Sequence, residues 1–144
     1  MTRRVRNLIC LWIIVLGLCN FAAYTVVYSY IGGDARNGGV EDGHFYVGGH
    51  FIHGVDGEDR IVSKGIWIYS YLHSITIWPT VAALLVSTLV LARPHIIATM
   101  REGVVGGQTL IAVFSTVIVL ISGAMTAWFL ADFVRELLEA SHGG

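Results

Sequence analysis

Charged side chains are scarce in this sequence. They make up 13% of the 144 residues, and Lys64 is the only lysine, whereas a typical soluble protein has about 25% charged residues. The composition therefore does not support a basic patch for nucleic acid. Cysteine is rare too: Cys10 and Cys19 are the only two, and they would lie about 13 Å apart along a helix, too far for a disulfide within it.

The scarcity of charge leaves three long uncharged stretches, at 8–31, 65–92 and 103–131. Each exceeds the roughly 20 residues that a helix needs to cross the hydrocarbon core of a bilayer. The sequence therefore predicts an all-α membrane protein with a single membrane domain over residues 1–144. The transmembrane helices are expected at about 8–31, 66–92 and 108–132.

Sequence patterns of several function classes are absent. The chain has no HExxH zinc motif, no glycine-rich phosphate loop and no Ser/His/Asp set, which disfavours the enzymes that use them. The uncharged stretches also lack the acids and broken helix pairs of transporters and the filter sequences of channels. The sequence therefore favours a protein that is not an enzyme.

The distribution of arginine predicts the orientation. The N-terminus and the loop 93–107 hold five arginines close to helix ends, whereas the loop 32–64 and the tail 133–144 hold most of the acids. By the positive-inside rule, the N-terminus and the 93–107 loop are cytoplasmic, and the 32–64 loop and the C-terminal tail are extracytoplasmic. This asymmetry and the small size favour a bacterial inner membrane.

The loop 32–64 is rich in glycine and histidine, and its turn signals alternate with strand-like runs. The turn signals are Gly32-Gly33-Asp34, Asn37-Gly38-Gly39, Asp42-Gly43 and Asp56-Gly57. The strand-like runs are 44–47, 51–55 and 60–62, and the Asp56-Gly57 turn favours pairing of the last two. We predict a small β-containing extracytoplasmic cap between the first two transmembrane helices.

Polar and small residues in and near the apolar stretches predict helix caps and contacts. Asn20 lies deep in the first stretch and would need a partner on another helix, and Ser63 is a candidate N-cap of the second helix. Residues 132–139 could form a short amphipathic helix. The small residues of the third stretch, which permit close helix contact, are Ser115, Ser122, Gly123 and Ala127.

His73 lies about two turns inside the second predicted helix. An ionisable group at membrane depth is a functional hypothesis by default, and nearby hydroxyls and aromatic rings suit a quinone, a lipid or a partner helix. An ordinary interfacial aromatic belt, with His73 at headgroup level, is the alternative. The candidate ligand-binding residues are His73, Tyr69, Tyr24, Asn20 and Ser70.

The loop histidines His44, His50 and His53 are candidate metal ligands. Imidazole suits zinc, copper or haem iron, and a cap folded over the helices would bring these residues towards His73. Their spacing matches no strong zinc pattern, so solvated surface histidines are the alternative. An external pH sensor built on the histidines is a third hypothesis.

The leading functional hypothesis is a non-catalytic accessory or assembly subunit without a cofactor. Its partners would be the lipid bilayer and either a larger membrane complex or a second copy of the chain, with no nucleic acid. The alternative is a redox, metal-handling or quinone-handling membrane protein that uses His73 and the loop histidines. That alternative requires a bound metal, haem or quinone.

Overall fold

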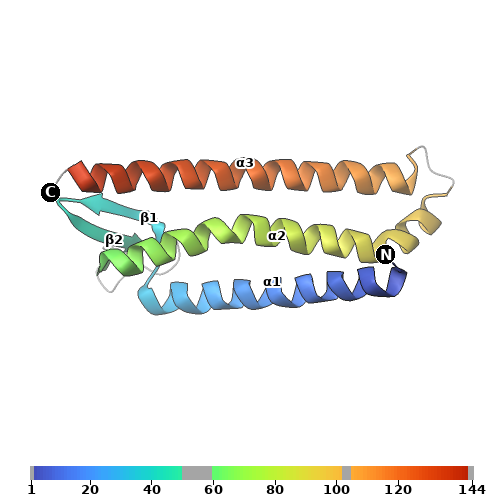
Figure 1. The fold of residues 1–144 in the computed structure, drawn as a ribbon, viewed down its shortest axis with the longest axis horizontal. Helices are drawn as coiled ribbons and strands as arrows, with labels where there is room; N and C mark the ends of the chain where they lie inside the picture. Colours follow the sequence, from blue (N-terminus) through green and yellow to red (C-terminus); the bar gives the residue numbers. More distant parts are fainter. Residues whose placement is uncertain (1, 50–59, 102–104, 143–144) are drawn as a thin grey trace. The chain divides into compact units, whose positions relative to one another are not determined.

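The computed structural model of the chain contains three long helices and a small three-stranded sheet (Figure 1). It describes residues 2–49, 60–101 and 105–142. The three helices are long and apolar enough to cross a membrane, so the fold is compatible with an integral membrane protein. The elements are α1 (Arg3–Ile31), β1 (Asp34–Glu41), β2 (His44–Gly48), β3 (Arg60–Val62), α2 (Lys64–Thr99) and α3 (Gly107–His142).

The helices extend beyond the predicted apolar spans. Helix α2 begins after Ser63, whose Oγ accepts a hydrogen bond from the Ile66 N–H at 3.4 Å, which confirms the predicted N-cap. Helix α2 then continues through Pro94 to Thr99. Helix α3 runs without a break to His142, so the predicted short helix at 132–139 is its last part. Charged residues end an apolar span without ending the helix, because the helical backbone satisfies its own hydrogen bonds in either medium.

The sheet has the strand order β1-β2-β3, with both pairs antiparallel. Strands β2 and β3 confirm two of the three predicted strand runs, and the third, 51–55, lies outside the described residues together with the Asp56-Gly57 turn. Among the described residues β3 pairs with β2, with Tyr46 opposite Ile61. Asp42 and Gly43 join β1 to β2 with φ angles of 47° and 74°, as a two-residue type I′ hairpin turn requires.

The turn predicted at Gly32-Gly33 is present after α1, but Asp34 and the predicted turn Asn37-Gly38-Gly39 belong to strand β1, which corrects the sequence analysis. Glycine there serves close strand pairing instead. A Cβ on Gly38 would lie 2.0 Å from the carbonyl oxygen of Tyr46, and a Cβ on Gly33, at φ +148°, would lie 2.2 Å from that of Gly48. The register shifts between Asp34 and Gly39, as at a β-bulge. Gly33 and Gly38 are therefore positions where two backbones approach.

The chain falls into two compact units, and all three helices run through both. We call Met1–Asn20 with Trp78–Met125 the helical unit, and Phe21–Ile77 with Thr126–Gly144 the cap unit. In the helical unit, Asn20 Nδ2 donates to Thr80 Oγ1 at 3.0 Å, which confirms the predicted partner on another helix.

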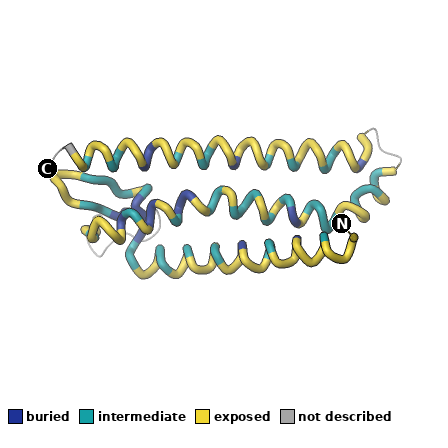
Figure 2. Tube along the Cα trace, in the orientation of Figure 1, coloured by how far each residue is buried: buried dark blue, intermediate teal, exposed yellow. Residues whose placement is uncertain are grey.

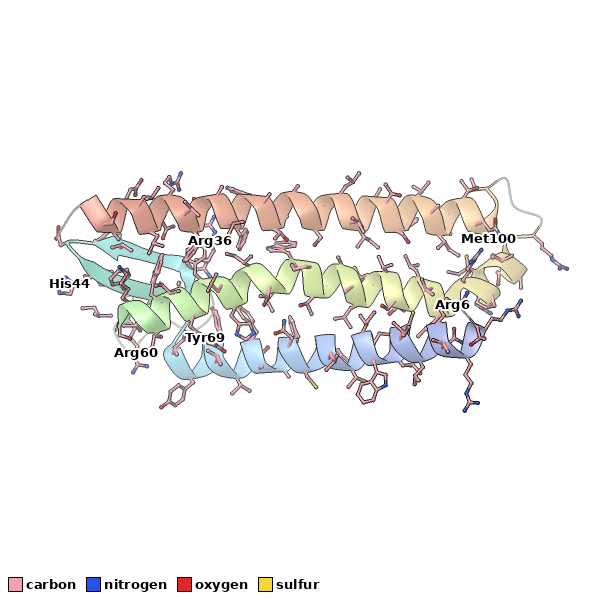
Figure 3. The ribbon with its side chains drawn as sticks, viewed as in Figure 1. Arg6, Arg36, His44, Arg60, Tyr69 and Met100 are labelled. Carbon is pink, nitrogen blue, oxygen red and sulfur yellow. The ribbon has the colours of Figure 1, made fainter. Side chains whose placement is uncertain are left out.

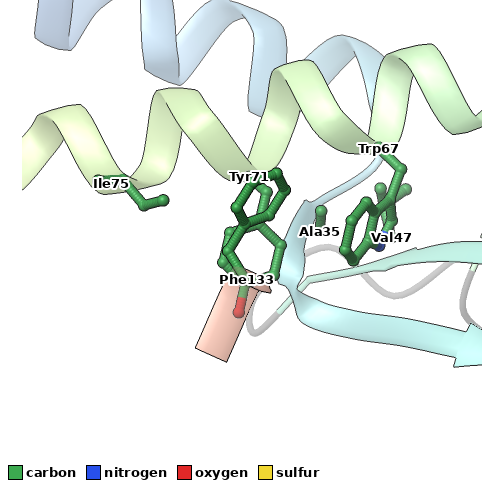
Figure 4. Close-up of a cluster of buried hydrophobic side chains, with 6 residues drawn as sticks. All are labelled: Ala35, Val47, Trp67, Tyr71, Ile75 and Phe133. Carbon is green, nitrogen blue, oxygen red and sulfur yellow. The ribbon is translucent and has the colours of Figure 1, made fainter. Parts of the chain in front are cut away.

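The cap unit contains a hydrophobic core between the sheet and the helices. Buried positions concentrate there, whereas much of each helix is exposed (Figure 2). On α2, Trp67 and Tyr71 are fully buried, and the four-residue spacing places Ile75 on the same face. The Trp67 ring lies 5.1 Å from Tyr71 and 5.9 Å from Phe133, between centroids. The core residues are Ala35, Val47, Trp67, Tyr71, Ile75 and Phe133 (Figure 4).

Candidate functional site

His73 of α2 lies between two tyrosine rings in the cap unit. Its ring centroid is 5.4 Å from that of Tyr24, on α1, and 5.6 Å from that of Tyr69, one turn earlier on α2. Both pairs are edge-on, at 80° and 68°, a favourable geometry for aromatic rings. The fold therefore brings together three of the candidate ligand-binding residues.

Tyr24 and Ser70, two of the candidate ligand-binding residues, also attach strand β1 to the helices. The Tyr24 hydroxyl donates to Asp34 Oδ2 at 2.6 Å, and Asp34 is only 6% exposed. The second carboxylate oxygen of Asp34 accepts from the Asn37 N–H at 2.9 Å. Ser70 Oγ accepts from the Ala35 N–H at 3.1 Å. Hydrogen bonds to a carboxylate are stronger than neutral ones, so the Tyr24–Asp34 bond stabilises the start of β1.

A narrow crevice adjoins His73. Within it, Tyr24, Asp34 and Ser70 have hydrogen-bond partners, whereas His73 Nδ1 is buried and has none among the described residues. An unpaired buried polar atom costs free energy, so a partner for this nitrogen would stabilise the protein. The lining residues are Tyr24, Val27, Tyr28, Ile31, Gly33, Asp34, Ser70 and His73.

Asp132 of α3 is the centre of a second polar arrangement in the cap unit. Its side chain is 7% exposed, and its carboxylate pairs with Arg36 Nη1 at 3.0 Å and with Arg135. The Tyr71 hydroxyl donates to Asp132 Oδ2 at 3.3 Å. Arg36 extends from β1 (Figure 3), and its guanidinium carbon is 5.0 Å from the ring centroid of Phe129. We call this group of residues the Asp132 network.

The Asp132 network was missed by the sequence analysis. Arg36 lies in a glycine-rich loop and Asp132 at the end of an apolar stretch, so each was counted only as a loop or tail charge. Nothing in the sequence pairs residues so far apart in the chain. The one signal was position: Asp132 directly follows an uncharged stretch on the same helix.

The structure describes two of the other candidate residues, His44 and Asn20. His44 is exposed beside the hairpin turn, with Nδ1 3.0 Å from the Asp42 carbonyl oxygen, and it does not line the crevice. His50 and His53 lie outside the described residues. Asn20 belongs to the helical unit. In the described part of the chain, no three His, Cys, Asp or Glu residues are grouped as metal ligands, so the metal site stays a prediction.

Comparisons of the chain with protein-family models, with curated proteins and with solved structures found no match. The function is therefore inferred from the chain's own residues. In the cap unit, the polar groups of the Asp132 network bond to one another, as is typical of groups that stabilise a fold. The crevice beside His73 has no room for a water molecule, and it leaves the buried Nδ1 without a hydrogen-bond partner among the described residues.

Proposed function

We propose that the protein is a non-catalytic integral membrane subunit that associates with a larger membrane protein or with a second copy of itself. Support comes first from the polar residues of the cap unit. Asp34 and Asp132 are buried, and their carboxylates are occupied by Tyr24 and Arg36. Carboxylates bonded in this way have charge-assisted partners that stabilise the fold.

The observation that carries the proposal is the environment of Gly123 on α3. Gly123 is exposed, and a Cβ added there would meet nothing within 4 Å, whereas its neighbour Ser122 is buried. Glycine inside a helix costs about 1 kcal/mol relative to alanine, and packing among the described residues does not require it. A small residue on the outer face of a membrane helix lets another helix approach closely.

The test is the native mass of the protein after mild detergent extraction. We expect wild type to run well above the mass of one chain, either with a partner or as an oligomer. Gly123→Leu should release a single chain, because the side chain fills the space that a second helix would occupy. Leucine also has a higher helix propensity than glycine, so the loss would not reflect unfolding of α3.

Val117→Leu is the matched control. Val117 is 47% exposed on the same helix and lies six residues before Gly123, on a different face, so a leucine there leaves the approach at Gly123 open. We expect this variant to keep the wild-type mass. A wild-type protein that is strictly monomeric, or two variants that behave alike, would contradict the proposal.

A second candidate function is the binding of a quinone, haem or metal at His73. The supporting observation is the buried Nδ1 without a hydrogen-bond partner among the described residues, next to the rings of Tyr24 and Tyr69. An imidazole nitrogen can donate to a quinone carbonyl or bind a metal ion. Aromatic rings beside it would pack against a flat ligand.

This second candidate is tested on the purified protein by its absorbance spectrum, metal content and extractable quinone. We expect near-stoichiometric bound ligand in wild type and its loss in His73→Leu. His95→Leu, at an exposed position of the same helix, should retain the ligand. A wild-type protein that carries no haem, metal or quinone would remove this candidate and leave the first untouched.

A further inference from the structure

A basic cavity lies in the helical unit, between the beginning of α1 and the last turns of α2. Its volume is about 510 Å³, within the range of about 300–1,000 Å³ of small-molecule sites. Figure 3 labels Arg6 and Met100 near it. None of the candidate residues discussed above belongs to it. The lining residues are Arg3, Arg6, Asn7, Arg93, Pro94 and Ile97.

Three guanidinium groups line this cavity, and among the described lining residues there is no carboxylate. The ion pairs of the described residues are both with Asp132, so Arg3, Arg6 and Arg93 have no acidic partner there. The Nε of Arg6 is buried and has no hydrogen-bond partner in the described part of the chain. Like charges gathered without counter-charge repel one another, so the cavity is suited to an anion.

The chemistry of the donors favours phosphate. A guanidinium presents planar N–H groups that match two oxygens of a phosphate, and such charge-assisted pairs are among the strongest hydrogen bonds. Helix α1 begins at Arg3, so the positive end of its dipole adds to the same field. Asn7 contributes a neutral amide that can donate as well.

The place of these residues in the sequence favours a lipid as the source of the phosphate. Arg6 lies two residues before the apolar stretch that begins at Leu8, and Arg93 directly follows 66–92. In a helix that crosses the bilayer, such positions lie at the depth of the lipid phosphates. Pro94 and Ile97 give the cavity an apolar side against which a glycerol or acyl chain can pack. Basic pockets between transmembrane helices bind acidic headgroups in this way.

We propose that this cavity binds the phosphate of an acidic phospholipid. The test is native mass spectrometry of the full chain in mild detergent, titrated with phosphatidylglycerol or with phosphatidylcholine. We expect one tightly retained phosphatidylglycerol per chain, with at least tenfold preference over the zwitterionic lipid. Arg6→Gln should weaken retention at least tenfold, because it removes the guanidinium whose Nε is buried.

Arg4→Gln is the matched control, because Arg4 has the same charge on the same helix but does not line the cavity. We expect retention within twofold of wild type. Equal losses in the two variants would mean general attraction to a negative surface and would overturn the proposal. So would equal binding of the two lipids. Circular dichroism of both variants checks that the helices are intact.

Inorganic phosphate distinguishes the two sources of the anion. We expect millimolar phosphate to leave the bound phosphatidylglycerol in place, because free phosphate lacks the acyl chains. Displacement of the lipid by millimolar phosphate, together with the tenfold weaker retention in Arg6→Gln, would overturn the lipid as occupant. It would assign the cavity to free phosphate.

Discussion

The cap unit and the helical unit bury side chains to very different extents. The cap unit has an aromatic core in which Trp67 and Tyr71 are fully buried. In the most apolar 18-residue window of each helix, by contrast, 11% of α1 and 6% each of α2 and α3 is buried. In water such exposure would be strongly unfavourable. In the proposed bilayer it is not, because lipid tails are as apolar as the side chains.

The two units also differ in their polar bonds. In the cap unit, Asp34 and Asp132 are buried and bonded by a tyrosine hydroxyl and a guanidinium. In the helical unit, the interhelical bond from Asn20 to Thr80 joins two neutral groups. The described ion pairs, both with the buried Asp132, belong to the cap unit, so the loss of a charge partner should cost most there. Four sets of substitutions test the contrast between the two units.

The largest effect is expected from Trp67→Ala. The change removes a fully buried ring from the cap core and should cost about 3–5 kcal/mol in the free energy of opening of the cap unit. Hydrogen exchange of the backbone amides of β1 and β2 measures that opening. Trp12→Ala, at a position 58% exposed in the helical unit, is the control and should leave these amides protected. Equal effects of the two would abolish the contrast between the units.

Asp132→Asn should have the next largest effect, about 3 kcal/mol on the same measurement, because it leaves the Arg36 charge without its counter-charge. The control is Glu139→Gln, at an exposed position of the same helix. It should leave the free energy of opening of the cap unit nearly unchanged.

The double variant Arg36→Met with Asp132→Leu sharpens the interpretation of the Asp132 network. Removing both charges together should restore most of the protection, since a buried ion pair often contributes little more than apolar residues of similar size. A double variant as unstable as Asp132→Asn would mean that the shape of the network, and not its charge, stabilises the cap unit.

The smallest effect is expected in the helical unit. The coupling between Asn20→Leu and Thr80→Val, measured as a double-mutant cycle in a titration from mild detergent into SDS, should be about 0.6 kcal/mol. That is the average for hydrogen bonds between membrane helices. A coupling above about 2 kcal/mol would show that the helical unit also depends on its polar bonds.

Local signals were sufficient for several elements. The uncharged stretches located the three helices, Ser63 marked the start of α2, and the residue pair Asp42-Gly43 marked the hairpin turn. Each of these depends on the chain within a few residues of itself. Strand β1 was missed because glycine has two uses, in turns and in close backbone pairing, and only the strand beside it distinguishes them.

The sequence by itself determined that the chain forms long apolar helices, because charge and hydropathy act locally and a bilayer accepts an apolar helix without further packing. Only the tertiary structure decided which polar groups are paired. Arg36 meets Asp132, and Tyr24 meets Asp34, while His73 Nδ1 and Arg6 Nε have no hydrogen-bond partner in the described part of the chain. Such partners are set by distances between side chains on different elements, which no local pattern contains.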